Sequence, residues 1–330
     1  MSCFDAIHEV PSVLAMAQAE ANDVGMPRVA VLLAAYNGAP FLDELLDSVT
    51  AQSSVSLKIF ISIDPSTDDT EALLRGRAAS DPRLVLLPTG QRFGSAAANF
   101  LRLLREADLE SCDYVALADQ DDIWLPHKLQ RGCELLSHTG ADAYSSNVIA
   151  FWPDGRRALV DKAQPQTDWD FLFEGGGPGC TFLLRRSLAL KLKEFAESRQ
   201  AELADIHHHD WLIYAYSRAN GYQWIIDSRP GALYRQHGSN QVGVNRGWRA
   251  FGSRARAVLT GAGVAQALVL ARVVGLAEHD FVRRMAGPGR MRFLRLAARA
   301  FDCRRRRRDQ WLFGLACLSL FVFGERRDET

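Results

Sequence analysis

The sequence lacks the glycine-rich motifs with which many folds hold a nucleotide. No G-x-G-x-x-G follows the first apolar run, and no G-x-x-x-x-G-K-[ST] occurs anywhere in the 330 residues. G-x-S-x-G and H-E-x-x-H are also missing, which argues against a serine hydrolase and against a zinc protease. We therefore expect any bound nucleotide to be held by side chains and a metal ion rather than by a glycine-rich cradle.

Cysteines are few, and charge of one sign does not dominate. The six cysteines form no C-x-x-C pair and no disulfide framework, so we expect reduced thiols in a cytosolic protein. Lysine plus arginine and aspartate plus glutamate each number 39, so no nucleic-acid partner is expected. No signal peptide is visible, and no stretch reaches the roughly 20 apolar residues that span a bilayer.

Apolar runs alternate with amphipathic stretches over the first two thirds of the chain. The runs predict strands at 28–35, 57–63, 83–88, 114–118, 141–152, 180–186 and 222–226. Helices are predicted at 40–52, 70–79, 96–107, 126–139, 187–198 and 211–220. This alternation predicts an α/β fold with a mostly parallel sheet flanked by helices on both faces. In such sheets, ligands bind beyond the carboxyl ends of the strands.

The composition changes near residue 247, where acidic residues become rare. We predict an N-terminal extension at 1–26, a catalytic domain at 27–246, and a helical C-terminal region at 247–330 with helices near 254–284 and 290–301. Five consecutive arginines at 304–308 precede a mostly apolar segment at 311–323. This segment is too short to span a membrane, but it suits an anionic membrane surface. The alternative is a buried helix or a subunit interface beside a solvated basic run.

One apolar run ends abruptly in three carboxylates, those of Asp119, Asp121 and Asp122. Carboxylates this close repel one another unless water or a cation neutralises them. Asp119 and Asp121 are two residues apart, so in an extended segment they point the same way. Two hard oxygen ligands suit Mg²⁺ or Mn²⁺, with coordination positions left open for a diphosphate. The alternative is a solvated acidic turn before the next helix.

Three motifs, in this order and spacing, carry a resemblance to a known family. They are AAYNG from residue 34, SIDPSTDDT from residue 62 and ALADQDDIW from residue 116. Together they resemble glycosyltransferase family 2, which has the GT-A fold. DQDDIW, followed by Pro126 and Lys128, is similar to bacterial rhamnosyltransferase-like members. The resemblance covers about residues 27–245.

This resemblance implies a set of side chains along the nucleotide. They are Ala34, Tyr36, Asn37, Asp64, Arg92, Asn99 and Asp119. Asp64 falls on the aspartate that contacts the base in the family. Pro65 stands where the family often has glycine, and Arg92 lies beside the place of a missing asparagine. Turn chemistry for Tyr36 and Asn37, and a solvated charge for Arg92, remain as alternatives.

The same resemblance assigns the metal, the catalytic base and the sugar sites. Asp119, Asp121 and His237, the last within YRQHGSNQ, would bind the metal or the diphosphate. Asp210 matches the family's catalytic base, and a helix N-terminus favours its ionised form. The alternative for Asp210 is an ordinary helix cap. The donor and acceptor sugars would meet Asp122, Trp124, Gly179, Cys180, His209 and Trp211.

The resemblance implies an inverting hexosyltransferase that uses a dTDP- or UDP-sugar, with dTDP-rhamnose preferred, and Mg²⁺ or Mn²⁺. The acceptor would be a hydroxyl of a surface polysaccharide or a lipid-linked glycan. The protein is then expected in the cytoplasm, peripheral on the inner face of the plasma membrane, in an oligomeric state that the sequence leaves open. Two other hypotheses are a nucleotidyltransferase acting on sugar phosphates and a non-catalytic, membrane-associated scaffold with the same fold.

Overall fold

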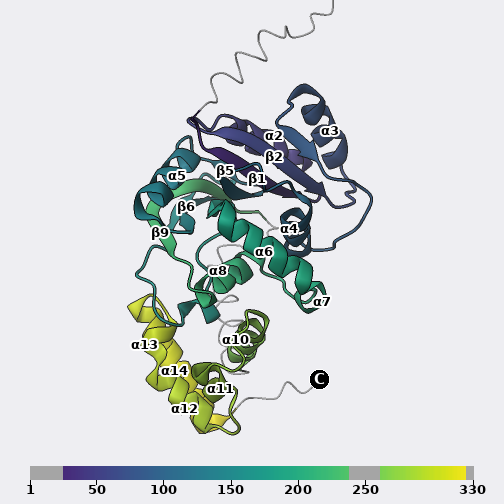
Figure 1. Ribbon diagram of the computed structural model, residues 1–330. Helices are drawn as coiled ribbons and strands as arrows, with labels where there is room; N and C mark the ends of the chain where they lie inside the picture. Colours follow the sequence, from purple (N-terminus) through teal and green to yellow (C-terminus); the bar gives the residue numbers. More distant parts are fainter. Residues whose placement is uncertain (1–24, 238–260, 325–330) are drawn as a thin grey trace, which may run out of the picture.

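The computed structural model describes residues 25–237 and 261–324. Strands and helices alternate as far as Arg235, and the regular elements described in 261–324 are all helices (Figure 1). The strands are β1 (Arg28–Ala35), β2 (Ser56–Ile63), β3 (Leu84–Leu86), β4 (Tyr114–Asp119), β5 (Ile123–Trp124), β6 (Ala143–Phe151), β7 (Arg157–Val160), β8 (Leu183–Arg185) and β9 (Trp224–Arg235). The predicted N-terminal extension up to residue 24 and the predicted domain boundary near 246 lie outside the described residues.

Helices flank the strands in the first part and make up the second. Around the sheet lie α2 (Ala39–Thr50), α3 (Thr70–Ser80), α4 (Ala96–Glu106), α5 (Lys128–Thr139), α6 (Arg186–Ser198), α7 (Gln200–Leu203) and α8 (His209–Ala219), with 3₁₀ turns η1 (Asp170–Leu172) and η2 (Gly179–Thr181). The C-terminal region holds α10 (Ala262–Val273), α11 (Asp280–Ala286), α12 (Met291–Ala298), α13 (Ala300–Cys303) and α14 (Arg307–Phe323). The predicted helix at 290–301 is thus two helices.

The strands of the described residues form one sheet in the order β3-β2-β1-β4-β8-β6-β9-β5, and β7 pairs with β6. β3, β2, β1 and β4 are parallel, whereas β8 is antiparallel to both β4 and β6. The predicted parallel pairing holds from β3 to β4 and again between β6 and β9, but β5, β7 and β8 pair in the antiparallel sense, so the sheet is mixed. The reason is that the chain enters β8 from the edge where β4 ends, so that η2 lies beside the end of β4.

Two strands were missed by the sequence analysis, and one was cut short. β5 has two residues and β7 has four, both too short for a periodic pattern. β9 continues well past the predicted end at residue 226, through Pro230. Its pairing with β6 shifts register between Ser146 and Val148, and proline is tolerated at such an irregularity.

The sheet is buried on both faces because its central strands are apolar throughout. In β1, Val31 and Leu33 pack on one face, while Ala30 and Leu32 pack on the other. The apolar stripes of α2 and α5 cover the first face, and those of α4, α6 and α8 cover the second. This double cover fixes the carboxyl ends of β1, β2 and β4 at one edge, where the loops that carry the motifs emerge (Figure 1).

The arginine run is not a uniformly solvated surface. The side chain of Arg305 is fully buried and paired with Asp170. Arg304 pairs with Glu174, and Arg306 pairs with Asp161. The hypothesis that all five arginines face a membrane or solvent is therefore wrong for Arg305, whereas Arg304 is partly buried and Arg306 stays exposed. Among the helices of the described residues, none has the length and hydropathy that crossing a bilayer requires.

Candidate active site

The end of β1 is tied to the end of β4 by a reciprocal pair of hydrogen bonds. Gln120 Oε1 accepts from the amide of Tyr36 at 2.7 Å, and Gln120 Nε2 donates to the Tyr36 carbonyl at 2.8 Å. The next residue, Asn37, has a positive φ of 48°. Its side-chain oxygen accepts from the amide of Thr67 at 2.8 Å. Asn37 therefore joins the loops after β1 and β2, while the Tyr36 side chain stays exposed and free to meet a ligand.

Asp64, at the end of β2, organises the loop before α4. Its two carboxylate oxygens accept from the backbone amides of Phe93 at 2.9 Å and Gly94 at 2.8 Å. Arg92 is exposed beside this loop. Asn99 is buried and donates to the carbonyl of Ser62 at 3.2 Å. The predicted nucleotide residues thus share one edge, but Asp64 and Asn99 also hold the backbone of that edge.

The acidic motif at the end of β4 forms a compact cluster. Ligand atoms of Asp119, Asp122 and Cys180 all lie within 4.8 Å of one another. Burial, and then the negative charge of Asp121, raises the pKa of Asp119 to about 7. Burial also raises the pKa of Asp122 well above its usual value. Oδ2 of Asp122 is buried and accepts no hydrogen bond from the described residues. The cluster is therefore short of positive charge.

A loop from the far end of the domain supplies basic groups to this cluster. β5 pairs with β9, and the pairing brings Arg235 and His237 back to the acidic motif. The Arg235 amide donates to Asp122 Oδ1 at 3.1 Å, and its Nε donates to the Asp121 carbonyl at 2.9 Å. His237 Nε2 lies 2.8 Å from Asp121 Oδ2, and its ring stacks on Phe41 at 4.8 Å. The predicted metal residues Asp121 and His237 are thus in contact.

These groups fit a divalent cation of the hard type. Asp119 and Asp121 offer carboxylate oxygens, His237 offers an imidazole nitrogen, and the excess negative charge favours a cation. Cys180 fits less well, because burial raises the pKa of its thiol and a thiol is a soft ligand. Its side chain is fully buried, as is nearly all of Trp124. Buried side chains of this kind present little surface to a sugar, and the predicted sugar contact of Cys180 and Trp124 stays a prediction.

Lys128 belongs to this site, although sequence reasoning gave it no role there. Burial lowers the pKa of its ammonium to about 7, while the charges of Asp122 and Asp119 oppose that change. Its Nζ lies 3.0 Å from the ring centroid of Trp124, a cation–π contact that fixes both side chains behind the acidic motif. The signal available in the sequence was the lysine six residues after Asp122, at the start of the following helix.

The predicted base, Asp210, lies in the first turn of α8. Its Oδ1 accepts from the amide of the next residue, Trp211, at 2.8 Å, while the N-cap position is His208, whose side chain makes no cap bond. Its charge contributes, after burial and the charge of Asp121, to the raised pKa of Asp119, so the two carboxylates belong to one electrostatic site. His209 is buried and stacked on Phe100 at 4.0 Å, and burial lowers its pKa to about 4.

Gly179 brings the glycine-rich loop against this turn. A Cβ on Gly179 would lie 2.9 Å from His209 Nε2 and 3.3 Å from Asp210 Cβ. Only glycine allows so close an approach, which accounts for its place in the sequence. Trp211 is half-buried and donates from Nε1 to the carbonyl of Phe171 at 2.8 Å. The loop, the base and the acidic cluster therefore border one another.

Comparisons with known proteins agree with this arrangement. A sequence model described as "Glycosyl transferase family 2" matches residues 30–192. A dTDP-rhamnosyl transferase of Shigella flexneri, RfbG, is 39% identical over 292 residues, which are 88% of this chain and 100% of that protein. The chain belongs to glycosyltransferase family 2. The predicted family and the predicted activity, sugar transfer from a nucleotide sugar, are thereby confirmed.

Two further relatives of this family 2 enzyme extend the comparison. The amylovoran biosynthesis glycosyltransferase AmsB of Erwinia amylovora is 26% identical over 219 residues, covering 62% of this chain and 68% of that protein. The crystal structure of S. aureus TarS 1-349 with UDP-GlcNAc covers 90% of this chain and 89% of that one, with a TM-score of 0.52 and 12% identity. The latter likeness confirms the predicted GT-A fold. Family membership favours sugar transfer over nucleotidyl transfer and over a non-catalytic scaffold.

Proposed function

We propose that this glycosyltransferase moves rhamnose from dTDP-rhamnose to a hydroxyl of a surface polysaccharide or lipid-linked glycan, with inversion at the anomeric carbon. The observation that carries the donor is the 39% identity along the full length of a dTDP-rhamnosyl transferase. The acidic cluster at the end of β4 and the base at the start of α8 supply the chemistry. Because their charges interact, we place both in one site, in which the acceptor hydroxyl would face the base and the leaving diphosphate would face the acidic cluster.

We assign a residue to each part of the proposed reaction. Asp121 and His237, with Asp119, would hold Mg²⁺ or Mn²⁺. A bound divalent cation would stabilise the negative charge on the departing diphosphate. Asp210 would take the proton of the acceptor hydroxyl while the acceptor oxygen attacks the anomeric carbon. Asp64 would orient the base of the nucleotide. Its carboxylate also fixes the loop of Phe93 and Gly94 beside that position.

A donor screen tests this proposal. Thermal unfolding is followed with dTDP-rhamnose, dTDP-glucose, UDP-GlcNAc and GDP-mannose, each with Mn²⁺ and with EDTA. We expect dTDP-rhamnose with Mn²⁺ to raise Tm the most, because a ligand that binds only the folded state stabilises it. A clear preference for a UDP- or GDP-sugar would overturn the donor assignment. If the donor still raises Tm in EDTA, donor binding does not need a metal ion, and the proposed metal role is contradicted.

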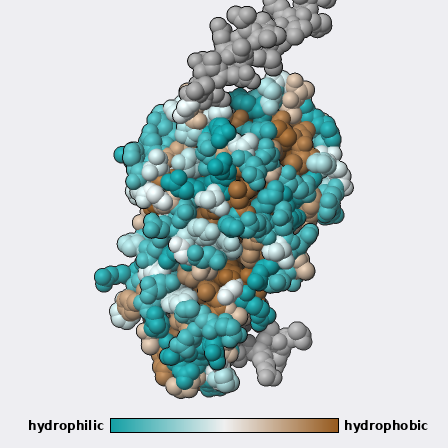
Figure 2. Space-filling model, in the orientation of Figure 1, coloured by the Kyte–Doolittle hydropathy of each residue, from teal (hydrophilic) through white to brown (hydrophobic). Residues whose placement is uncertain are grey.

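We also propose that the enzyme rests on the inner face of the plasma membrane through α14. The outward face of this helix carries Trp311, Leu312, Leu315, Leu318, Val322 and Phe323, of which Trp311 is 63% and Leu315 61% exposed. Arg308 lies one turn before Leu312 and is exposed, so a cation borders the apolar face. Figure 2 shows mixed teal and brown surface over the lower part of the molecule, where Figure 1 draws the C-terminal helices.

Point substitutions test the membrane contact without disturbing Arg305. Leu315→Asp should lower binding to vesicles that contain phosphatidylglycerol, because it places a charge in the apolar face. Ala72→Asp, on the exposed face of α3, adds the same charge elsewhere and should bind like the unaltered protein. Vesicle binding is measured by flotation. If Leu315→Asp floats with the vesicles as much as Ala72→Asp does, the proposed membrane contact is refuted. A shift in molar mass with Leu315→Asp would point to a subunit interface.

A further inference from the structure

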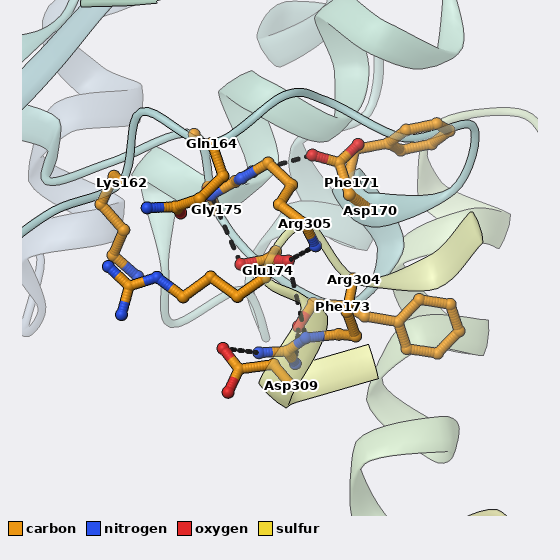
Figure 3. Close-up of polar contacts among 12 residues, drawn as sticks. Lys162, Gln164, Asp170, Phe171, Phe173, Glu174, Gly175, Arg304, Arg305 and Asp309 are labelled. Carbon is orange, nitrogen blue, oxygen red and sulfur yellow. Dashed lines mark hydrogen bonds and ion pairs between the residues drawn. The ribbon is translucent and has the colours of Figure 1, made fainter. Parts of the chain in front are cut away.

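A buried arginine from the C-terminal region reaches into the segment that leads to the glycine-rich loop. The side chain of Arg305 has no exposed surface, and neither has that of Asp170, its partner. Its Nη1 donates to Asp170 Oδ2 and its Nη2 to the carbonyl of Gly175, both at 2.8 Å. Its backbone amide donates to Glu174 Oε1, also at 2.8 Å. Figure 3 shows Arg305 extending between Asp170 and Glu174.

The segment held in this way continues into the loop that touches the base. Gly175 precedes Gly176, whose carbonyl accepts from Ser145 Oγ at 2.6 Å. A Cβ on Gly176 would lie 2.6 Å from the ring of Tyr214, so this backbone packs directly on α8. Three residues after Gly176, Gly179 packs on Asp210. A shift at Gly175 is thus passed along a short, closely packed backbone to the acceptor side of the site.

A second route joins Arg305 to the helix that carries the base. The Tyr214 hydroxyl donates to Asp170 Oδ2 at 2.7 Å, beside the bond from Arg305. Arg218, on the same helix, donates to Asp170 Oδ1 at 3.1 Å. Tyr214 lies one turn after Asp210 on α8, so both point from the same face. Asp170 is therefore the common partner of the C-terminal region and of the catalytic helix.

We infer that Arg305 is a positioning residue that sets the glycine-rich loop and Asp210 for the acceptor. The inference rests on the proposed function in that it takes Asp210 as the base. Arginine suits this place because its planar fork serves a carboxylate and a carbonyl at once, which a lysine ammonium does not. The C-terminal region then contributes to the acceptor site. The acceptor contacts the glycine-rich loop, and the conformation of that loop depends on residues 304–305.

Kinetics of Arg305→Gln, measured well below its Tm, test the inference. We expect kcat to fall by roughly 10- to 100-fold, the cost of a small misplacement of reacting groups, and KM for the acceptor to rise. The Kd for the donor should stay within about twofold, because the nucleotide edge lies on β1, β2 and β4. Arg305→Lys should recover part of kcat. Arg156→Gln removes an exposed arginine outside this segment, which pairs with Asp154, and should behave as the unaltered enzyme.

Hydrogen exchange gives a readout that does not depend on the donor. In Arg305→Gln, amides of 175–182 should exchange about tenfold faster or more, while those of 92–99 and 119–124 keep their rates. Unchanged exchange at 175–182, or a donor affinity that falls as much as kcat, would overturn the inference. If no nucleotide sugar supports transfer by the unaltered enzyme, the proposed function fails. The exchange result still decides whether Arg305 positions the backbone of 175–182. If Arg305→Gln does not fold, Arg304→Gln removes the neighbouring bond to the Phe173 carbonyl and should give a smaller change of the same kind.

Discussion

His237 Nε2 lies 2.8 Å from Oδ2 of Asp121, although 116 residues separate the two in the chain. The contact joins the segment after β9, the last strand in the sequence, to the acidic motif at the end of β4. The ring of His237 is held flat against Phe41, so its nitrogen is aimed before any ligand arrives. Side chains that are already held in the binding geometry lose little conformational entropy when a cation binds. Single substitutions among them are therefore informative.

Asp121→Asn should lower the transfer rate by roughly a thousandfold while the fold remains intact. The amide removes one negative charge from the proposed metal ligands and with it the stabilisation of the leaving diphosphate. Asp154→Asn, at an exposed turn where the carboxylate meets only Arg156, is the matched control. Transfer is measured with increasing Mn²⁺. Full activity of Asp121→Asn in EDTA would contradict the proposed role.

Asp210→Asn should lower kcat by roughly two to four orders of magnitude, the usual contribution of a general base. The asparagine oxygen can still accept from the Trp211 amide, so Tm should change little. Donor affinity, measured by calorimetry, should also be unchanged. A collapse of Tm in this variant would mean that the carboxylate is mainly a helix cap.

Asp64→Asn should weaken donor binding by roughly 10- to 100-fold, because charge-assisted hydrogen bonds contribute about 1.5–3 kcal/mol. Both carboxylate oxygens accept backbone amides, and the NH₂ group of asparagine would face one of them as a second donor. The loop of Phe93 and Gly94 should then loosen beside the nucleotide. Kd for the donor is the measurement. An unchanged Kd with a normal fold would show that this loop does not border the nucleotide.

The free energy of unfolding should fall as the pH drops from 6.5 toward 4, in part because of His209. Burial lowers the pKa of His209 to about 4, so in this window the unfolded chain binds a proton that the folded protein does not. Between pH 6.5 and 5 this one group should remove about 1.5 kcal/mol of stability. Urea unfolding of His209→Gln should show a shallower pH dependence. His138→Gln, at an exposed helix end, should match the unaltered protein, and equal slopes for all three would refute the assignment.

The sequence was sufficient for the parts of the site that follow directly from strand ends. Tyr36, Asp64 and Asp119 each come at the end of an apolar run, and parallel pairing brings such ends to one edge. The helix that begins at His209 was also predictable, because its apolar stripe and its acidic first turn are both local patterns.

Contacts between distant segments were not predictable in this way. Nothing in a run of five arginines distinguishes Arg305 from Arg308, because the difference lies in Asp170 and Glu174, about 130 residues earlier. Lys128 likewise looked like an ordinary helical lysine until the fold buried it against Trp124. Periodicity reports which face of an element is apolar, but it does not report what that face meets.

The pairing of β5 with β9 also bears on how the protein is made. A ribosome that adds 5–20 residues per second needs roughly 6–23 s to pass from Asp121 to His237, which are 116 residues apart. During that interval the carboxylates of the β4 end exist in the nascent chain without the strand that later delivers the histidine. The proposed cation binding would therefore be completed only late in synthesis, and a chain that ends before β9 would keep Lys128 at the acidic cluster but lack Arg235 and His237.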